Sequence, residues 1–142
     1  MRESWKLVTR LLGVLLTVGL LACGGDDVTG EQLRSVSAVG RWGGVGAAAM
    51  ITGSTALFEF DCAHGEIVGG LPTGTDGSFL IAGTFTLEGG PERDDDPRPS
   101  EPAEYRGLVV DDQMVLNVDT GNGSIGPITL MRDRQPVLRK CL

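Results

Sequence analysis

Three residues with reactive side chains lie close together in the segment FEFDCAHGEI, namely Cys62, His64 and Glu66. A cysteine and a histidine can act together as nucleophile and base, and thiolate, imidazole and carboxylate groups all bind zinc. A third interpretation is structural, because in an oxidising compartment Cys62 would form a disulfide bond with Cys141. The compartment in which the chain folds therefore decides which chemistry this cluster can perform.

The first 22 residues have the features of a secretory signal peptide. Arg2, Lys6 and Arg10 precede an uncharged apolar run from Leu11 to Ala22. Twelve residues are too few to cross a bilayer as a helix, which needs about 20. A basic start and a short apolar run that ends in a small residue are typical of a signal that is cleaved on export. We therefore expect residues 1–22 to be removed.

The end of the apolar run, Leu20-Leu21-Ala22-Cys23, resembles the lipobox of bacterial lipoproteins. The resemblance implies cleavage before Cys23 and acylation of its thiol and new amino group, which would hold the protein on a membrane of the cell envelope. Gly24 follows, where an aspartate would resemble the inner-membrane retention signal, so the outer membrane is favoured. The alternative is an ordinary signal peptide in which Cys23 has no special role.

The mature chain is acidic and long enough for one domain. Removal of Arg2, Lys6, Arg10 and Glu3 lowers the basic residues from 12 to 9 and the acidic residues from 19 to 18, which leaves a net charge of −9. Such a surface repels nucleic acid and anionic lipid and can attract cationic partners at long range, although acidity that only keeps the domain soluble is the favoured interpretation. Residues 23–39 are polar and are expected to form the lipidated cysteine and a tether, followed by one domain at 40–142.

Beyond residue 40, apolar residues alternate with polar ones, which is the pattern of β-strands, and no stretch keeps helical spacing. Short turns between the strands predict an all-β antiparallel meander, closed as a small up-and-down barrel, with a two-sheet sandwich as the alternative. Glycines inside strands suit tight coiling at barrel corners. The strands expected are Trp42–Ile51, Ala56–Cys62, Glu66–Leu71, Phe79–Leu87, Ala103–Val109, Met114–Val118, Ile128–Leu130 and Val137–Cys141, and the glycines are Gly43, Gly44, Gly46, Gly83 and Gly107.

Two further resemblances concern the domain. The motif Gly40-Arg41-Trp42 resembles the Gly-x-Trp of lipocalin-like barrels, which implies that Trp42 plugs one barrel end with Arg132 or Arg139 packed across its ring. The segments GRWGG, LFEFDCAHGEI, EGGPERDDDP, AEYRGLVV and LRKCL are similar to a group of uncharacterised bacterial lipoproteins. This likeness supports the fold and the cysteine pair and implies no activity.

Export favours the disulfide interpretation of the reactive cluster. If Cys23 is acylated, Cys62 and Cys141 remain and are expected to pair, which would contribute about 4.5 kcal/mol in the chain-entropy model. A zinc site needs three or four ligands, whereas the chain has one histidine and no Cys-x-x-Cys. No Gly-x-Ser-x-Gly segment frames a catalytic serine. We expect no metal or cofactor, and His64 in a turn without a chemical role.

Three functions remain open. The leading hypothesis is a non-enzymatic, lipid-anchored module that binds a protein or another component of the cell envelope, for which a cationic partner is one option. The second is a lipocalin-like carrier of a small apolar ligand, which needs an internal cavity of about 300 Å³ or more. The third is a hydrolase that uses His64. The interior ligand contacts of a carrier would be Phe58, Phe60, Phe79, Phe85 and Tyr105.

The acidic loop at residues 88–102 offers a weaker candidate site. Asp94, Asp95 and Asp96 could supply oxygen ligands for calcium, but the spaced Asp-x-Asp-x-Asp-Gly pattern is missing. Consecutive carboxylates beside prolines are more typical of a solvated loop. We therefore do not expect calcium binding.

Overall fold

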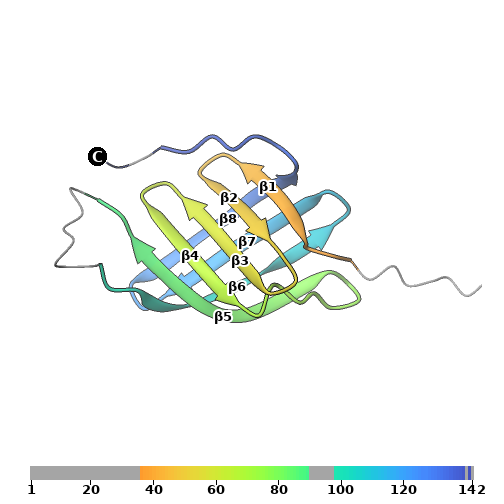
Figure 1. The fold of residues 1–142 in the computed structure, drawn as a ribbon, viewed down its shortest axis with the longest axis horizontal. Helices are drawn as coiled ribbons and strands as arrows, with labels where there is room; N and C mark the ends of the chain where they lie inside the picture. Colours follow the sequence, from red (N-terminus) through yellow and green to blue (C-terminus); the bar gives the residue numbers. More distant parts are fainter. Residues whose placement is uncertain (1–35, 90–97, 140, 142) are drawn as a thin grey trace, which may run out of the picture. The chain divides into compact units, whose positions relative to one another are not determined.

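The chain folds into a closed β-barrel of eight antiparallel strands (Figure 1). The computed structural model describes residues 36–89, 98–139 and 141. Each strand pairs with the next along the chain, and β8 pairs back with β1, so the predicted up-and-down barrel is confirmed and the two-sheet sandwich is excluded. Within the described ranges, no helix is long and apolar enough to cross a membrane. The strands are β1 Gly40–Gly44, β2 Ala47–Ile51, β3 Thr55–Phe60, β4 Ala63–Val68, β5 Ser78–Leu87, β6 Glu101–Val110, β7 Gln113–Thr120 and β8 Gly123–Arg132.

The barrel has two distinct ends. Residues 36–39 join it at the start of β1, and we call this the entry end, which lies on the right in Figure 1. Because neighbouring strands are antiparallel, the connections 52–54, 69–77 and 111–112 also lie at the entry end. The connections 45–46, 61–62 and 121–122 lie at the opposite end, which we call the far end.

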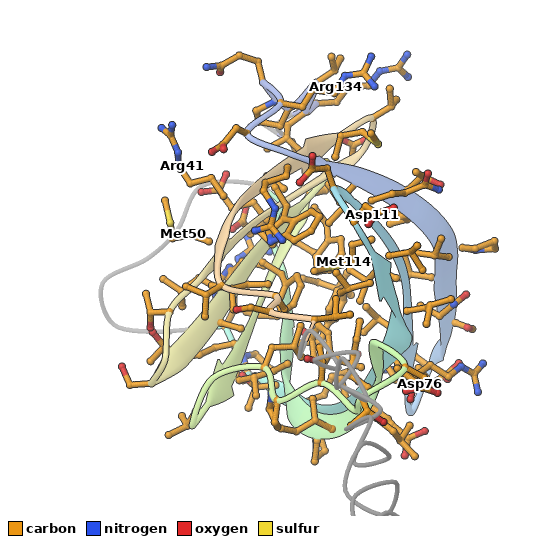
Figure 2. All side chains as sticks on the ribbon, turned by 90° about the vertical axis from the view of Figure 1, so that its right-hand side faces the viewer. Arg41, Met50, Asp76, Asp111, Met114 and Arg134 are labelled. Atoms are coloured by element: carbon orange, nitrogen blue, oxygen red, sulfur yellow. A yellow bond between two sulfur atoms is a disulfide. The ribbon has the colours of Figure 1, made fainter. Side chains whose placement is uncertain are left out.

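Side chains from alternate strand positions fill the inside of the barrel. The rings of Phe58 and Tyr105 stack with centroids 4.9 Å apart, and those of Phe60 and Phe85 lie 5.6 Å apart. Figure 2 looks into the entry end and shows Met114 inside the ring of strands, with Met50 on the outside. The largest fully buried side chains are Trp42, Tyr105, Phe58, Ile51, Ile67, Met114, Leu116, Leu130, Val109 and Val118.

Two of the predicted strands are wrong in number, and the strand expected at Ile128–Leu130 is longer, since β8 extends over Gly123–Arg132. The single strand expected over Trp42–Ile51 is two strands, because the chain reverses at Val45–Gly46, where Gly46 has a φ of 80°. The strand expected at Val137–Cys141 does not join the sheet. Since β1 is already hydrogen-bonded to β2 and β8, the closed barrel offers this segment no free edge to join.

The turn before His64 was also predicted in the wrong place. The chain reverses at Asp61–Cys62, and Cys62 takes a φ of 58°, so His64 lies within β4 instead of in a turn. The expected strand Glu66–Leu71 likewise begins earlier, at Ala63, and ends at Val68. Alternation in β4 buries Ala63 and Ile67 and leaves the imidazole of His64 on the outer surface.

Candidate functional site

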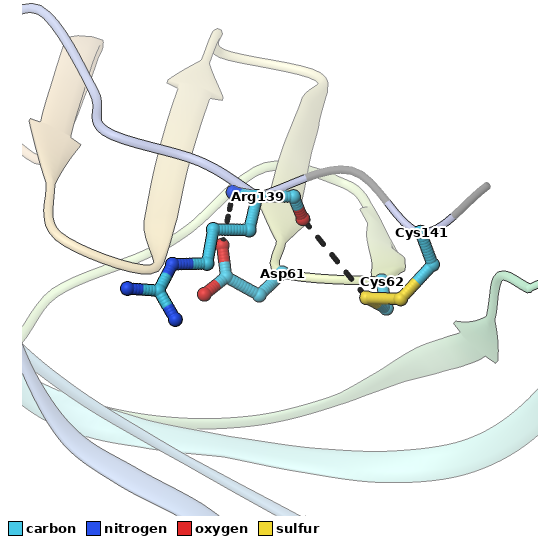
Figure 3. The surroundings of a disulfide bond; sticks show 4 residues. All are labelled: Asp61, Cys62, Arg139 and Cys141. Atoms are coloured by element: carbon cyan, nitrogen blue, oxygen red, sulfur yellow. Dashed lines mark hydrogen bonds between the residues drawn. A yellow bond between two sulfur atoms is a disulfide. The ribbon is translucent and has the colours of Figure 1, made fainter.

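The predicted disulfide between Cys62 and Cys141 is present, with a Cα–Cα distance of 5.0 Å (Figure 3). It holds residues 133–139, which follow β8, against the outside of the barrel. Beside it, the amide of Arg139 donates a hydrogen bond of 2.6 Å to Oδ1 of Asp61. Val137 forms an isolated parallel bridge with Val45, so the segment crosses the barrel from the entry end to the far end.

The C-terminal segment lies close to β1 because Gly43 has no side chain. A Cβ at Gly43 would overlap the carbonyl oxygen of Arg134 and would lie 2.9 Å from the amide nitrogen of Pro136. The amide of Val137 donates to the carbonyl of Gly44 over 2.9 Å, which continues the contact along the same strand. Gly43, which the sequence predicted as a position of barrel coiling, instead admits this segment.

A groove of about 280 Å³ lies between the C-terminal segment and the outer face of β1–β3. Met50 and Leu57, which are opposite each other on β2 and β3, supply its apolar part. Arg41 lies at the rim with its Nε 3.6 Å from Oδ1 of Asp133. The lining residues are Arg41, Trp42, Ala48, Ala49, Met50, Leu57, Glu59, Asp133, Arg134, Gln135 and Pro136.

Carboxylates surround His64 on the outer face of β3–β4. Nδ1 of His64 lies 2.7 Å from Oε1 of Glu88. Glu59 is opposite His64 in the register, and Glu66 is opposite Leu57. We call His64, Glu59, Asp61, Glu66 and Glu88 the acidic face. Glu59 also lines the groove, so the acidic face and the groove form one continuous surface.

This surface contains His64 and Glu66 of the reactive cluster. They are not arranged as the base of a cysteine nucleophile. The sulfur of Cys62 is bonded to Cys141 and therefore cannot act as a thiolate. In the part of the chain that the structure describes, no three His, Cys, Asp or Glu side chains are grouped to hold a metal ion. The arrangement provides an exposed region of negative charge beside an apolar groove.

A plug closes the entry end, as the Gly-x-Trp resemblance implied. The guanidinium carbon of Arg132 lies 4.2 Å from the centroid of the Trp42 ring, and Nε1 of Trp42 donates to the carbonyl of Ala38 over 2.7 Å. Arg132 also donates to the carbonyls of Ser37 and Val39 and, over 3.0 Å, to Oδ1 of Asp112. The alternative partner of Trp42, Arg139, lies at the far end beside Asp61.

Residues 36–39 belong to the packed structure, although the sequence predicted a tether up to residue 39. Ala38 is buried, and Val36 packs against the core. The hydroxyl of Thr73, in the β4–β5 connection, donates to the carbonyl of Val36. Sequence analysis missed these residues because four residues are too short for a periodic pattern, and their contacts come from distant loops.

The aromatic residues predicted as ligand contacts lie inside the barrel and contact one another or glycine. Phe58 lies between Phe60 and Tyr105, and the hydroxyl of Tyr105 donates to the carbonyl of Thr84 over 2.7 Å. Burial raises the pKa of Tyr105 far above its ordinary value. Phe79 packs where Gly107 has no side chain, since a Cβ there would lie 2.6 Å from the Phe79 ring.

Comparison with known proteins gives no assignment: no family model, curated protein or solved structure matches the chain. Two predicted sites, the lipidated Cys23 and the calcium candidate Asp94–Asp96, lie outside the described residues. The barrel, the acidic face and the groove are therefore the features that bear on function.

Proposed function

We propose that the protein is a non-enzymatic, lipid-anchored protein of the cell envelope whose barrel binds a cationic partner on its outer surface. The proposed binding mode depends on one observation: inside the barrel, aromatic rings occupy the space beside glycines. A barrel packed in this way favours recognition on the outside over storage of a ligand inside. The lipobox-like segment that ends at Cys23 supports the anchor and the location.

The acidic face and the groove define the chemistry of the partner. A basic peptide segment with one apolar side chain fits them, because the apolar side chain can enter the groove beside Met50 and Leu57. Its lysine or arginine side chains would then lie near Glu59 and Glu66 on the same face. The mature net charge of −9 increases the encounter rate with such a partner, and added salt weakens this attraction.

The binding surface can be tested by photo-crosslinking in cells, with the photoreactive amino acid at Leu57. We expect a discrete protein adduct, and we expect Glu66→Lys to reduce its yield severalfold. Glu104→Lys is the matched control, because it changes the net charge equally at an exposed position on β6. Equal yields in the two variants, or no adduct at Leu57, would reject this surface as the binding site.

The anchor is tested separately with Cys23→Ala. We expect the wild-type chain to carry acyl chains by intact mass and to fractionate with membranes, and the variant to lack acyl mass and leave the membrane fraction. Acyl-free wild-type protein would rule out the lipid anchor.

The carrier is the second candidate, because a closed barrel is the architecture that lipocalin-like carriers use. Native mass spectrometry of the mature protein separates the two functions. A retained apolar molecule would favour the carrier, and a bound protein would favour the interaction module.

A further inference from the structure

Four exposed apolar side chains lie on β4, β5 and β6 near the entry end, whereas Val45, Leu87 and Val137 are exposed toward the far end. Val68 ends β4 with 82% of its surface exposed, and Leu80, the third residue of β5, is 67% exposed. Leu108 and Val110 lie on the outer face of β6, and Leu80 and Leu108 are diagonal neighbours in the β5–β6 register. We call Val68, Leu80, Leu108 and Val110 the apolar patch.

The anchored end of the chain meets the barrel at the same end as the patch. Val36 to Val39 are fixed there by Thr73 and Arg132. Residues 24–35 separate this point from Cys23, and a chain of that length spans at most about 40 Å even when fully extended. An acylated Cys23 would therefore keep the entry end close to the lipid surface.

We infer that the apolar patch rests on the lipid surface to which the protein is anchored, an inference that depends on the lipid anchor of the proposed function. Apolar side chains gain free energy on leaving water. Because the anchor makes the contact intramolecular, a patch of four side chains that would not hold a free protein can still orient a tethered one. Glu59, Asp61 and Glu88 of the acidic face lie toward the far end with the disulfide and then remain accessible to a partner.

The charges at the entry end select the kind of lipid. Asp76 and Asp111 are exposed in the β4–β5 and β6–β7 connections, while Arg106, opposite Leu80 in the register, is paired with Asp119 over 3.0 Å. Carboxylates at this position are repelled by anionic headgroups and tolerate zwitterionic ones. We expect the contact with phosphatidylcholine to be stronger than the contact with a membrane rich in anionic lipid.

Tryptophan fluorescence of the mature acylated protein in phosphatidylcholine vesicles tests the inference. Processing removes Trp5, so the mature chain has one tryptophan, Trp42, which is buried and gives a constant background. We expect nitroxide-labelled lipids to quench the added fluorescence of Val68→Trp at least twofold more than that of Val45→Trp. Val45 is the matched control, since it is 78% exposed but lies at the far end. Leu80→Trp replaces Val68→Trp if that variant does not fold.

The outcomes separate the inference from the proposed function. Protein without acyl chains in its intact mass would refute the anchor and, with it, the reason for the contact. Acylated protein with equal quenching at Val68 and Val45 would refute the inference and leave the anchor standing. The emission of Val68→Trp could instead shift with protein density and not be quenched by the nitroxide lipid. The patch would then contact other copies of the protein, and this outcome also overturns the inference.

Discussion

At the scale of single residues, packing inside the barrel depends on positions without a side chain. A Cβ at Gly65 would overlap the hydroxyl of Tyr105 and lie 2.9 Å from the carbonyl oxygen of Thr84. The ring edge of Tyr105 would similarly lie 3.0 Å from a Cβ at Gly83. The tyrosine therefore occupies space that two glycines leave on β4 and β5.

Gly65→Ala should lower the free energy of unfolding by about 1–3 kcal/mol, because overpacking a tight interior forces neighbouring groups to move. Denaturant titration measures the change. Gly53→Ala is the control, since nothing lies within 4 Å of a Cβ there. Combining Gly65→Ala with Tyr105→Phe should recover part of the loss, because the phenylalanine lacks the overlapping hydroxyl. Equal stability of the Gly65 and Gly53 variants would contradict the packing argument.

Tyr105 should make the protein less stable at high pH. Burial raises its pKa in the folded state, whereas the unfolded value is about 10. Below pH 10 both states keep the proton, so this contribution is fully present. Above pH 10 the unfolded state loses the proton first, and the free energy of unfolding falls by up to about 1.4 kcal/mol per pH unit.

Two measurements check this dependence. Tyr105 is the only tyrosine, so phenolate absorbance reports it alone, and we expect the signal to appear only when the protein unfolds. Tyr105→Phe should remove this part of the slope. Phenolate absorbance that rises near pH 10 while the protein remains folded would contradict the burial.

Sequence patterns predicted which residues share the barrel interior but not which of them touch. Alternation placed Phe58, Phe60 and Tyr105 on inward faces, and the structure confirms their burial. Whether Tyr105 lies over Gly65 depends on the combined register of three strands, β4 to β6, which a single sequence does not determine.

At the scale of elements, Arg132 joins four parts of the fold. From the last position of β8 its side chain reaches the ring of Trp42, the carbonyls of Ser37 and Val39, and Asp112 in the β6–β7 turn. A planar guanidinium can make these bonds together, whereas a lysine ammonium on a flexible stem cannot.

Arg132→Lys should lower the free energy of unfolding by about 1–3 kcal/mol, since a lysine cannot keep the hydrogen bonds to Ser37 and Val39 together with the stacking on Trp42. It should also speed hydrogen exchange at the amides of residues 36–39. Arg134→Lys is the control, because that side chain is exposed. Unchanged exchange in Arg132→Lys would mean that the entry segment is held by other contacts.

The errors in the predicted strands concern whole elements. Apart from Arg41, β1 and β2 contain only glycine and apolar residues, so alternation did not reveal the reversal at Val45–Gly46. Residues 137–141 have strand-like composition, but closure of the sheet excludes them, and closure is not visible in local sequence. The positions of β3, β5, β6 and β7 were close to the prediction. Apolar and polar residues alternate in each of these strands, and turns rich in glycine, aspartate or proline lie between them.

At the scale of the whole molecule, the disulfide joins positions 79 residues apart. Replacing both cysteines with alanine should lower the free energy of unfolding by about 2–4.5 kcal/mol, because the unfolded chain gains the freedom that the cross-link removes. Reductant should destabilise the wild-type protein to a similar extent and leave the double variant unchanged. Two free thiols in the unreduced mature chain, found by intact mass, would contradict the cross-link.

Closure of the barrel through β1 and β8 has a consequence for how the chain acquires its structure. The first strand obtains its second neighbour only after residue 130 is available, so contacts of long sequence separation must form before the sheet is complete. Folding through such contacts is slow, and until the last strand arrives β1 and β7 present open edges that can pair with other chains. A ribosome or export channel that still holds β8 therefore also holds the protein in its most aggregation-prone form.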